Sequence, residues 1–219
     1  MKQIIHNNIN YLTREGTLDE FVIKEGDYEK RCSYTANDVW LDAGGNIGVF
    51  VCKYANKVDE IITFEPDDEN FDLLKKNIKL NDIKNYKAFK AALVGNKDKT
   101  RDFYLNTKKN KGTHSLMVTR GRDKITVKCQ NIDEVIKKYG VNKVKMDVEG
   151  AEYELLTSMD LDPIKEIVLE YHFNALKDHP GKEKYKEIIT ILENNFHELD
   201  FKMPEEINKH WTCIMHAKK

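Results

Sequence analysis

The sequence predicts an α/β protein built on a doubly wound, Rossmann-like sheet that is mostly parallel and ends in an antiparallel hairpin. From residue 39 onward, short apolar runs typical of buried strands alternate with segments whose apolar residues recur at helical spacing. Such a βαβα succession indicates parallel strands joined by right-handed crossovers. The last two apolar runs, 197–203 and 210–217, follow each other without a helix, which favours an antiparallel pair. The length of 219 residues suits one domain of this kind with a short extra segment.

The helices and strands of this domain, residues 39–219, are predicted from the glycines and prolines that end segments and from the spacing of apolar residues. Glycine ends the first apolar run, VWLDAGG, and Pro66 stops the second, EIITFEP. The segment ENFDLLKKNIKLN has helical spacing and follows Asp67 and Asp68, either of which can serve as its N-cap. The predicted strands cover residues 39–45, 60–66, 85–95, 125–129, 143–150 and 166–172, and the predicted helices cover residues 47–55, 69–81, 132–140, 151–159 and 183–195.

Two stretches are less regular. Residues 1–38 are expected to be an N-terminal extension, in which NYL and EFVIKE form a small hairpin covering one side of the site. Within residues 96–124, the run TRDFYLN suits an edge strand, and KKNKGTHSLMVTRGRDK has the polarity of a long surface loop with possible hinges at Gly112 and Gly121. A loop of this length in a compact domain is usually functional or mobile, so we expect a lid.

Charge and cysteine content argue against several classes of protein. The formal net charge is −1, so no overall field attracts the chain to nucleic acid. No apolar run approaches the roughly 20 residues that span a bilayer, and the start, MKQIIHNNINYL, does not resemble a signal peptide. Cys32, Cys52, Cys129 and Cys213 are far apart and form no C-x-x-C pair, which disfavours a zinc site or a disulfide framework. We therefore expect a cytoplasmic protein with reduced thiols, no nucleic-acid partner and no membrane span.

The segment LDAGGNIG, which closes the first predicted strand, is the leading candidate for a ligand-binding loop. Ligands of doubly wound sheets bind at the carboxyl ends of the strands, where this loop lies. Gly44 and Gly45 allow a tight turn and a close backbone approach, and Gly48 lets the next helix pack against the strand. Asp42 places a carboxylate where a ligand carries positive charge, and Asn46 can hydrogen-bond the same group. A bare strand-to-helix turn is the alternative.

The order of these residues discriminates between nucleotide cofactors. A dinucleotide fingerprint is G-x-G-x-x-G, whose glycines surround a pyrophosphate. Here an acidic residue stands two positions before the first glycine; it would repel pyrophosphate but suits the zwitterionic methionine end of S-adenosylmethionine. Glu65 ends the second strand, where it can bind both ribose hydroxyls, unless it is only a surface residue before the turn at Pro66. Ala91 and Ala92 end the third strand and would leave space for adenine.

Four segments carry a resemblance to a known family: LDAGGNIGVF, FEPDDENFDLLKKNI, KAALVG and VKMDVEGAEYELL. In this order they resemble the FkbM family of S-adenosylmethionine-dependent methyltransferases from about Thr17 to His172, and the THSL segment of the long loop fits the same pattern. Gly45 stands where this family more often has alanine. The resemblance implies a class I methyltransferase sheet and O-methylation, often of sugar hydroxyls. It also implies that such a chain can be a module of a larger glycan-building protein.

The predicted reaction site lies at the ends of two neighbouring strands. Asp147 and Glu149 are expected to share one face of their strand beside the cofactor loop, and Glu170 and His172 share a face of the next strand. His114 of the long loop can close over them. Methyl transfer from a sulfonium is an in-line displacement, and a base helps because a sugar hydroxyl is a poor nucleophile. Asp147 is the first candidate for that base.

Other interpretations of these residues stay open. His172 can be a strand-end histidine without a role, and His114 can be an exposed loop residue. The same carboxylates with His172 can hold Mg²⁺ or another divalent ion that acidifies the hydroxyl. Proton transfer without a metal is favoured, so no metal ligand is assigned. Glu152 and Glu154 are expected to belong to a solvated helix start.

We therefore expect an S-adenosylmethionine-dependent O-methyltransferase that acts on a sugar hydroxyl of a glycan or glycosylated metabolite. The alternatives are a methyltransferase of RNA, protein or another small molecule, and a module that binds the cofactor without catalysis. Where base-methylating enzymes often carry N/D-P-P-Y/F, this chain has Asp-Val-Glu-Gly. The expected catalytic residues are Asp147, His172, Glu149 and His114, and the expected cofactor contacts are Asp42, Gly44, Gly45, Asn46, Gly48, Glu65, Pro66, Ala91 and Asp147.

Overall fold

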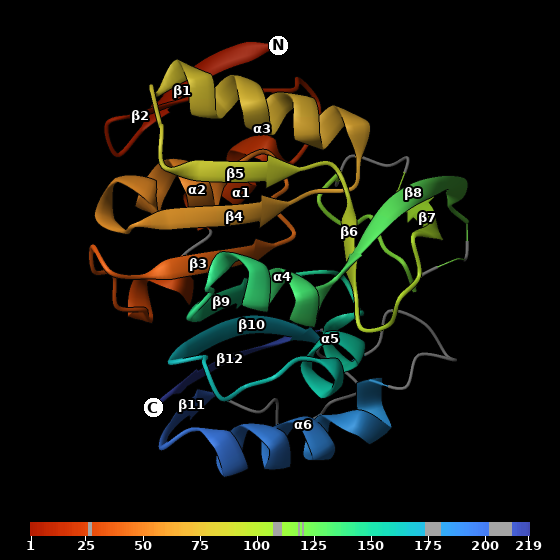
Figure 1. The fold of residues 1–219 in the computed structure, drawn as a ribbon. Coiled ribbons are helices and arrows are strands. Elements are labelled where there is room, and N and C mark those ends of the chain that lie inside the picture. The colour runs from red at the N-terminus through yellow and green to blue at the C-terminus, as the bar shows by residue number, and fades with distance from the viewer. Residues whose placement is uncertain (26–27, 107–110, 118, 120, 174–180, 202–211) are drawn as a thin grey trace.

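A seven-stranded central sheet forms the middle of the molecule (Figure 1). The computed structural model describes residues 1–25, 28–106, 111–117, 119, 121–173, 181–201 and 212–219. The strands of the sheet are β3 (Val39–Ala43), β4 (Glu60–Phe64), β5 (Tyr86–Phe89), β9 (Lys143–Met146), β10 (Glu166–His172), β11 (Glu198–Phe201) and β12 (Thr212–Lys218). Their order is β11-β12-β10-β9-β3-β4-β5; β10 to β5 are parallel, and β12 is antiparallel to both neighbours. The predicted fold with its final antiparallel hairpin is confirmed.

Helices cover both faces of this sheet because successive strand residues point to opposite sides. In β3, Trp40 packs with one group of helices and its neighbour Leu41 with the other, and both are 0% exposed. The first group is α1 (Asp19–Glu25), α2 (Val49–Tyr54) and α3 (Asp68–Leu80), and the second is α4 (Ile132–Tyr139), α5 (Glu152–Ser158) and α6 (Gly181–Asn195). None of the described helices combines the length and hydrophobicity needed to cross a membrane.

Side-chain caps begin two of these helices where the sequence indicates them. The Asp67 carboxylate accepts a hydrogen bond from the Asn70 backbone N–H at 2.8 Å, so Asp67, and not Asp68, is the N-cap of α3. Asn131 caps α4 in the same way through the Glu134 N–H at 2.9 Å. The cap at Asp67 holds the first turn of α3 directly beside the end of β4.

The predicted strand 85–95 is wrong, because the chain bends in its middle. β5 stays in the central sheet, and the Ala91 N–H then donates to the Phe89 carbonyl at 3.0 Å within the bend. The next strand joins a separate three-stranded sheet of order β6-β8-β7, which also contains the predicted strands around 100–106 and 125–129. The strands of this side sheet are β6 (Ala92–Val94), β7 (Thr100–Leu105) and β8 (Asp123–Asn131).

The long loop lies partly outside the described residues, which exclude 107–110, 118 and 120. Its described part, 111–117, is joined to β7 by two backbone hydrogen bonds between Tyr104 and Ser115, at 2.8 and 3.1 Å. The Ser115 hydroxyl donates to the Glu149 carbonyl at 2.6 Å. This part of the loop is therefore attached both to the side sheet and to the segment after β9, and its predicted action as a lid stays a prediction.

The N-terminal extension forms a hairpin of β1 (Lys2–His6) and β2 (Ile9–Thr13). The predicted segment NYL lies in β2, but its partner strand is β1 and not EFVIKE. EFVIKE lies in α1 and buries Ile23 completely, so its prediction as a strand is wrong. The hairpin packs on α3, where Asn77 Oδ1 accepts the Leu12 N–H at 2.7 Å. The Asn77 side chain thus accepts a hydrogen bond from β2 that a neighbouring strand would otherwise accept.

Candidate active site

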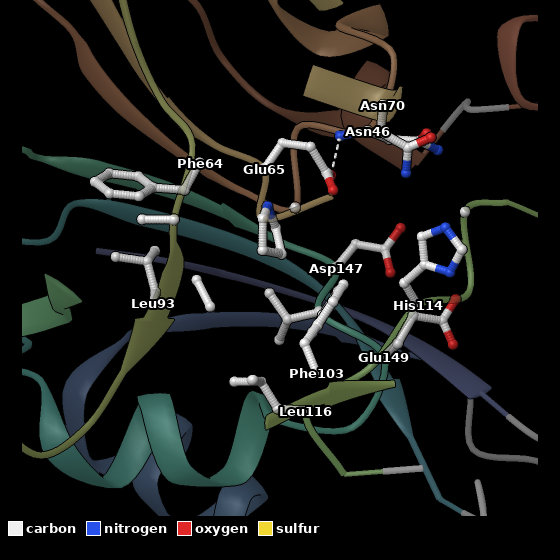
Figure 2. A pocket seen from close by; sticks show the side chains of 16 residues that line it. Asn46, Phe64, Glu65, Asn70, Leu93, Phe103, His114, Leu116, Asp147 and Glu149 are labelled. Carbon is white, nitrogen blue, oxygen red and sulfur yellow. Dashed lines mark hydrogen bonds between the residues drawn. The ribbon is translucent and has the colours of Figure 1, made fainter. Parts of the chain in front are cut away.

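A cavity opens at the carboxyl ends of β3, β4 and β9, where the side sheet and the long loop approach them (Figure 2). The chain winds from β3 outward to β5 on one side and from β9 to β10 on the other, so β3 and β9 flank the point where the strand order reverses. Six of the predicted cofactor contacts line the cavity: Gly44, Asn46, Glu65, Pro66, Ala91 and Asp147. Asp42, Gly45 and Gly48 do not.

Gly44 and Gly45 bring the loop close to the sheet. Gly44 has a φ of +87°, and a Cβ there would lie 1.9 Å from the Asp147 carbonyl oxygen. The N–H groups of both glycines donate to the Phe64 carbonyl, at 3.1 and 2.8 Å. A Cβ at Gly45 would lie 2.3 Å from Thr63 Oγ1 of β4. Glycine, where the family more often has alanine, therefore leaves the space that the Thr63 side chain occupies.

Asp42 lies beneath the loop and not on the cavity. Its carboxylate is 0% exposed, lies 3.1 Å from the Lys145 ammonium and accepts the Thr63 hydroxyl at 2.7 Å. Lys145 also donates to the Gly44 carbonyl at 2.7 Å. Asp42 thus supports the loop through Lys145, and its contact with the cofactor stays a prediction. Gly48 begins α2 with a φ of +86°.

Asn46 and Glu65 meet at the rim of the loop. The Asn46 N–H donates to Glu65 Oε2 at 2.8 Å, and the Asp67 N–H donates to Oε1 at 2.9 Å (Figure 2). Glu65 is 5% exposed, and burial raises its pKa to about 7. These donors orient a carboxylate that can accept hydrogen bonds from a pair of ligand hydroxyls. The Asn46 Oδ1 atom is buried and has no hydrogen-bond partner among the described residues.

The opposite side of the cavity is apolar. Figure 2 shows Phe64 and Leu93 away from Asp147 and Glu149, and Phe103 and Leu116 between these two groups. Ala91 lines the same side, not at the end of a strand as predicted but in the bend between β5 and β6. Small and flat apolar surfaces of this kind suit an aromatic ring such as a purine.

Asp147 and Glu149 line the cavity from the segment after β9. The strand ends at Met146 and Glu149 has a φ of +53°, so the predicted shared strand face is wrong. Metal-ligating atoms of Asp147, Glu149 and His172 lie within 4.8 Å of one another, a spacing compatible with one divalent cation. Burial, with repulsion from Asp147, raises the pKa of Glu149 to about 8 and that of Glu170 to about 7.

His172 is held between two carboxylates and does not line the cavity. Its Nδ1 lies 2.9 Å from Glu152 Oε1, and its Nε2 lies 3.3 Å from Glu149 Oε2. Burial lowers the pKa of His172, but attraction to Glu152 and Glu149 outweighs this and raises it well above its usual value. Each ring nitrogen thus has a carboxylate partner, so the ring can hold Glu149 and Glu152 in position, and its catalytic role stays a prediction.

Glu152 and Glu154 are not a solvated helix start, so that prediction is wrong. Glu152 is 0% exposed and, besides His172, accepts the Gly150 N–H at 3.1 Å. Glu154 accepts the Gly95 N–H at 2.8 Å and Arg101 at 2.7 Å. Apart from Gly150, these partners lie on β10, directly after β6 and on β7, far away along the chain, so helix-start composition does not reveal them.

His114 is buried and lines the cavity. Its Nδ1 accepts the Asn106 N–H at 2.8 Å, and burial lowers its pKa to about 4. The ring is therefore neutral with its proton on Nε2, which lies 3.9 Å from Asp67 Oδ1. His114 can donate a hydrogen bond to a ligand, but its Nδ1 is not available as a general base.

Two further lining residues, Asn70 and Phe103, were not among the sequence candidates. Asn70 is a polar residue in the first turn of the helix that follows Glu65, and this position in the sequence is enough to predict that it lies near the cavity. Phe103 comes from β7 and reaches the site only because the chain leaves the central sheet after β5.

The winding of the sheet, the glycine loop after β3 and the acidic residue after β4 define a class I methyltransferase fold. The fold is similar to that of methyltransferase FkbM from Methylobacillus flagellatus KT, with a TM-score of 0.54 and 13% identity over 86% of this chain and 45% of that chain. It is also similar to a Streptococcus mutans protein solved in complex with SAH, with a TM-score of 0.52 and 10% identity over 95% of this chain and 99% of that one.

The chain belongs to the FkbM methyltransferase family, because the Methyltransferase FkbM domain matches residues 42–203. It is 27% identical to Methyltransferase sdnD of Sordaria araneosa, over 57% of this chain and 61% of that protein. It is 29% identical to Methyltransferase 1 of Beauveria bassiana (strain ARSEF 2860), over 59% of this chain and 63% of that protein. The matched part thus spans about three fifths of these relatives' length.

Proposed function

We propose that this methyltransferase uses S-adenosylmethionine to methylate a hydroxyl of a sugar, in a glycan or a glycosylated metabolite. The observation that carries the proposal is that Asp147 and Glu149 line the same cavity as Asn46 and Glu65. A cofactor lying along the loop therefore has its reactive end beside carboxylates that can receive a proton.

The residues of the cavity fit this cofactor. Glu65 directs its carboxylate toward the cavity, where it suits the ribose hydroxyls, and the apolar side around Leu93 suits adenine. The buried Asn46 Oδ1, without a partner among the described residues, can accept a hydrogen bond from an ammonium group. The Asp147 carboxylate favours a cationic sulfonium and disfavours the pyrophosphate of a dinucleotide.

S-adenosylmethionine supplies a methyl group that is activated by its sulfonium. The chain must align the acceptor oxygen and take up the hydroxyl proton. We assign proton uptake to Asp147, which lines the cavity, and hydrogen bonding of the acceptor to His114 through Nε2–H. His172 and Glu152 are positioning residues that hold Glu149 in place.

RNA is the second candidate acceptor, because the fold is also similar to that of an rRNA methylase from Streptococcus thermophilus. That structure has a TM-score of 0.51 and 10% identity over 89% of this chain and 94% of its own. The Asp147 carboxylate on the cavity opposes this alternative, because it repels phosphate groups near the transfer point. A neutral acceptor with many hydroxyls meets no such repulsion.

The test is methyl incorporation into a panel of sugars, glycan fragments and short RNAs, read by mass spectrometry. We expect a sugar to gain one methyl group and RNA to gain none. Asp147→Asn should lower kcat by about 10²–10⁴, whereas the exposed Asp72→Asn should behave as the wild type. Methylation of RNA alone would replace the sugar assignment. Cofactor binding without methylation of any acceptor would favour a non-catalytic binding module.

We also propose a reducing, cytoplasmic setting. All four cysteines are buried and none forms a disulfide. A role as a module of a larger glycan-building protein rests on the family resemblance alone. Fractionation of source cells, followed by immunodetection of the chain, tests both points.

A further inference from the structure

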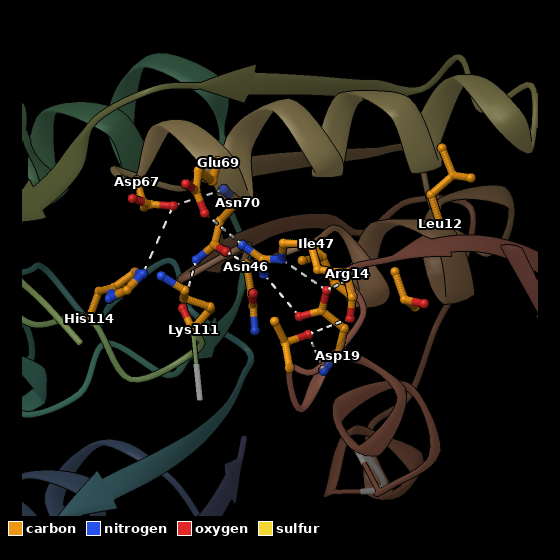
Figure 3. A network of polar contacts seen from close by, with 12 residues as sticks. Leu12, Arg14, Asp19, Asn46, Ile47, Asp67, Glu69, Asn70, Lys111 and His114 are labelled. Atoms are coloured by element: carbon orange, nitrogen blue, oxygen red, sulfur yellow. Dashed lines mark hydrogen bonds and ion pairs between the residues drawn. The ribbon is translucent and has the colours of Figure 1, made fainter. Parts of the chain in front are cut away.

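A polar network joins the N-terminal segment to the rim of the cavity (Figure 3). Arg14, directly after β2, donates through Nη2 to Asn70 Oδ1 at 2.8 Å. Asn70 Nδ2 donates to the Lys111 carbonyl of the long loop at 3.0 Å. Because Asn70 itself lines the cavity, Arg14 lies one side chain away from the ligand space.

The guanidinium of Arg14 is fixed before any ligand arrives. Its Nε and Nη2 donate to the two carboxylate oxygens of Asp19 at 3.0 and 2.9 Å, in a bidentate pair. Asp19 is 5% exposed and also accepts the Arg14 backbone N–H at 2.8 Å. A fork held in this way has one orientation, so little rotamer freedom is lost when it binds a further group.

One end of this guanidinium has no hydrogen bond within the described part of the chain. The Arg14 Nη1 atom is buried, and its ion-pair neighbour is Glu69 Oε2 at 3.6 Å, on a side chain that is 67% exposed. The Asn46 Oδ1 atom, in the cofactor loop, is also buried without a hydrogen-bond partner there. Buried polar atoms without partners are uncommon in folded proteins. One of these two atoms belongs to Asn46, which lines the cavity, and the other belongs to Arg14, which is held against the cavity-lining Asn70, so both point to ligand contacts.

The two atoms differ in a way that specifies the ligand. Arg14 Nη1 is a cationic donor and matches a carboxylate, while Asn46 Oδ1 is an acceptor and matches an ammonium. A group that carries both is the zwitterionic end of an amino acid.

We propose that Arg14 and Asn46 bind the amino-acid end of S-adenosylmethionine, an inference that rests on the cofactor of the proposed function. Arg14 Nη1 pairs with the carboxylate, and Asn46 Oδ1 accepts a hydrogen bond from the ammonium. Asn70 holds Arg14 toward the cavity that Asn46 lines. The N-terminal segment therefore completes the cofactor site.

The test compares two ligands by calorimetry: S-adenosylhomocysteine, which has the amino-acid end, and 5′-methylthioadenosine, which lacks it. Arg14→Gln and Asn46→Ala should each weaken S-adenosylhomocysteine by about 10- to 100-fold and change 5′-methylthioadenosine by less than about twofold. Arg31→Gln, on an arginine that pairs with Asp200 at the surface, is the matched control and should change neither.

The outcomes separate this inference from the proposed function. Equal weakening of both ligands would mean that Arg14 acts only by holding Asn70, and no weakening would mean that it makes no contact; either result overturns the inference. Failure of the wild type to bind either ligand would overturn the cofactor assignment itself. Binding of 5′-methylthioadenosine reports that each variant is folded, and Arg14→Lys, which keeps the charge but not the fork, should lose less affinity than Arg14→Gln.

Discussion

Glu65 links cofactor binding to pH through its own protonation. Burial raises its pKa to about 7, and only the ionised carboxylate can accept from Asn46, Asp67 and the ribose at once. As the pH falls through 7, Glu65 gains a proton, so affinity for S-adenosylhomocysteine should fall on the acid side and level off above about pH 8. Calorimetry over this range measures it. Glu65→Gln should bind about 10- to 100-fold more weakly with a flatter pH profile; an unaltered profile would assign the titration to another group.

The residues Asp147, Glu149 and His172 are expected to work without a metal, although their ligand atoms lie within 4.8 Å of one another. Both ring nitrogens of His172 already have carboxylate partners, Glu152 at 2.9 Å and Glu149 at 3.3 Å, and attraction to these carboxylates raises the pKa of His172. EDTA should therefore leave methyl transfer unchanged, and added Mg²⁺ or Mn²⁺ should not raise it. Loss of activity with EDTA and its return with Mg²⁺ would contradict this and identify a metal centre.

At the scale of elements, Asn131 caps α4 and also bonds the turn that follows β6 of the side sheet. Asn131 Oδ1 caps the helix, and its Nδ2 donates to the carbonyls of Gly95 and Asn96 at 3.0 and 2.9 Å. Asn131→Asp keeps the cap but loses both donated bonds, so we expect a loss of about 1 kcal/mol in the free energy of unfolding. Asn131→Ala loses the cap as well and should cost about 2 kcal/mol. Urea unfolding measures both, and equal values would show that the cap contributes nothing.

The element that departs most from prediction is the strand 85–95. Its composition, NYKAFKAALVG, is compatible with one strand, but the chain bends after Phe89 and β6 pairs with β8. That pairing involves residues more than thirty positions away, which local propensity does not contain. The bend has a consequence for the site, because it places Ala91 and Leu93 on the cavity.

At the scale of the whole molecule, a buried ionic cluster ties the N-terminal extension to the start of the sheet. The Lys143 ammonium lies 2.8 Å from Glu166 and 3.0 Å from Asp38, and it donates to Ser33. Burial raises the pKa of Glu166, but hydrogen bonds from His216, Lys143 and Ser33 outweigh it and lower the pKa to about 2. The Glu166 carboxylate thus contacts both Ser33 of the N-terminal extension and His216 of β12.

This cluster predicts how stability depends on pH. Because the folded pKa of Glu166 lies below its ordinary value of 4.5, its contribution is complete above that pH and is lost as the pH falls toward 2. Glu166→Gln should lower the free energy of unfolding by about 3–5 kcal/mol at neutral pH and reduce the slope of acid unfolding. Urea unfolding at neutral and acid pH measures both effects. The exposed Glu198→Gln is the control, and an equal acid slope in both variants would contradict the assignment.

The central sheet, its winding, the glycine loop and Glu65 can be predicted from the sequence, because they depend on hydrophobic periodicity and on turn residues that act within a few positions. The sequence also indicated Asp147 and Glu149, since residues after parallel strands collect at one edge. Packing alone reveals that Asp42 supports the loop from below, that Glu152 holds His172, and that Arg14 is bonded to the cavity-lining Asn70. Those roles depend on burial and on partners that are distant along the chain, and both arise only when the strands and helices have packed.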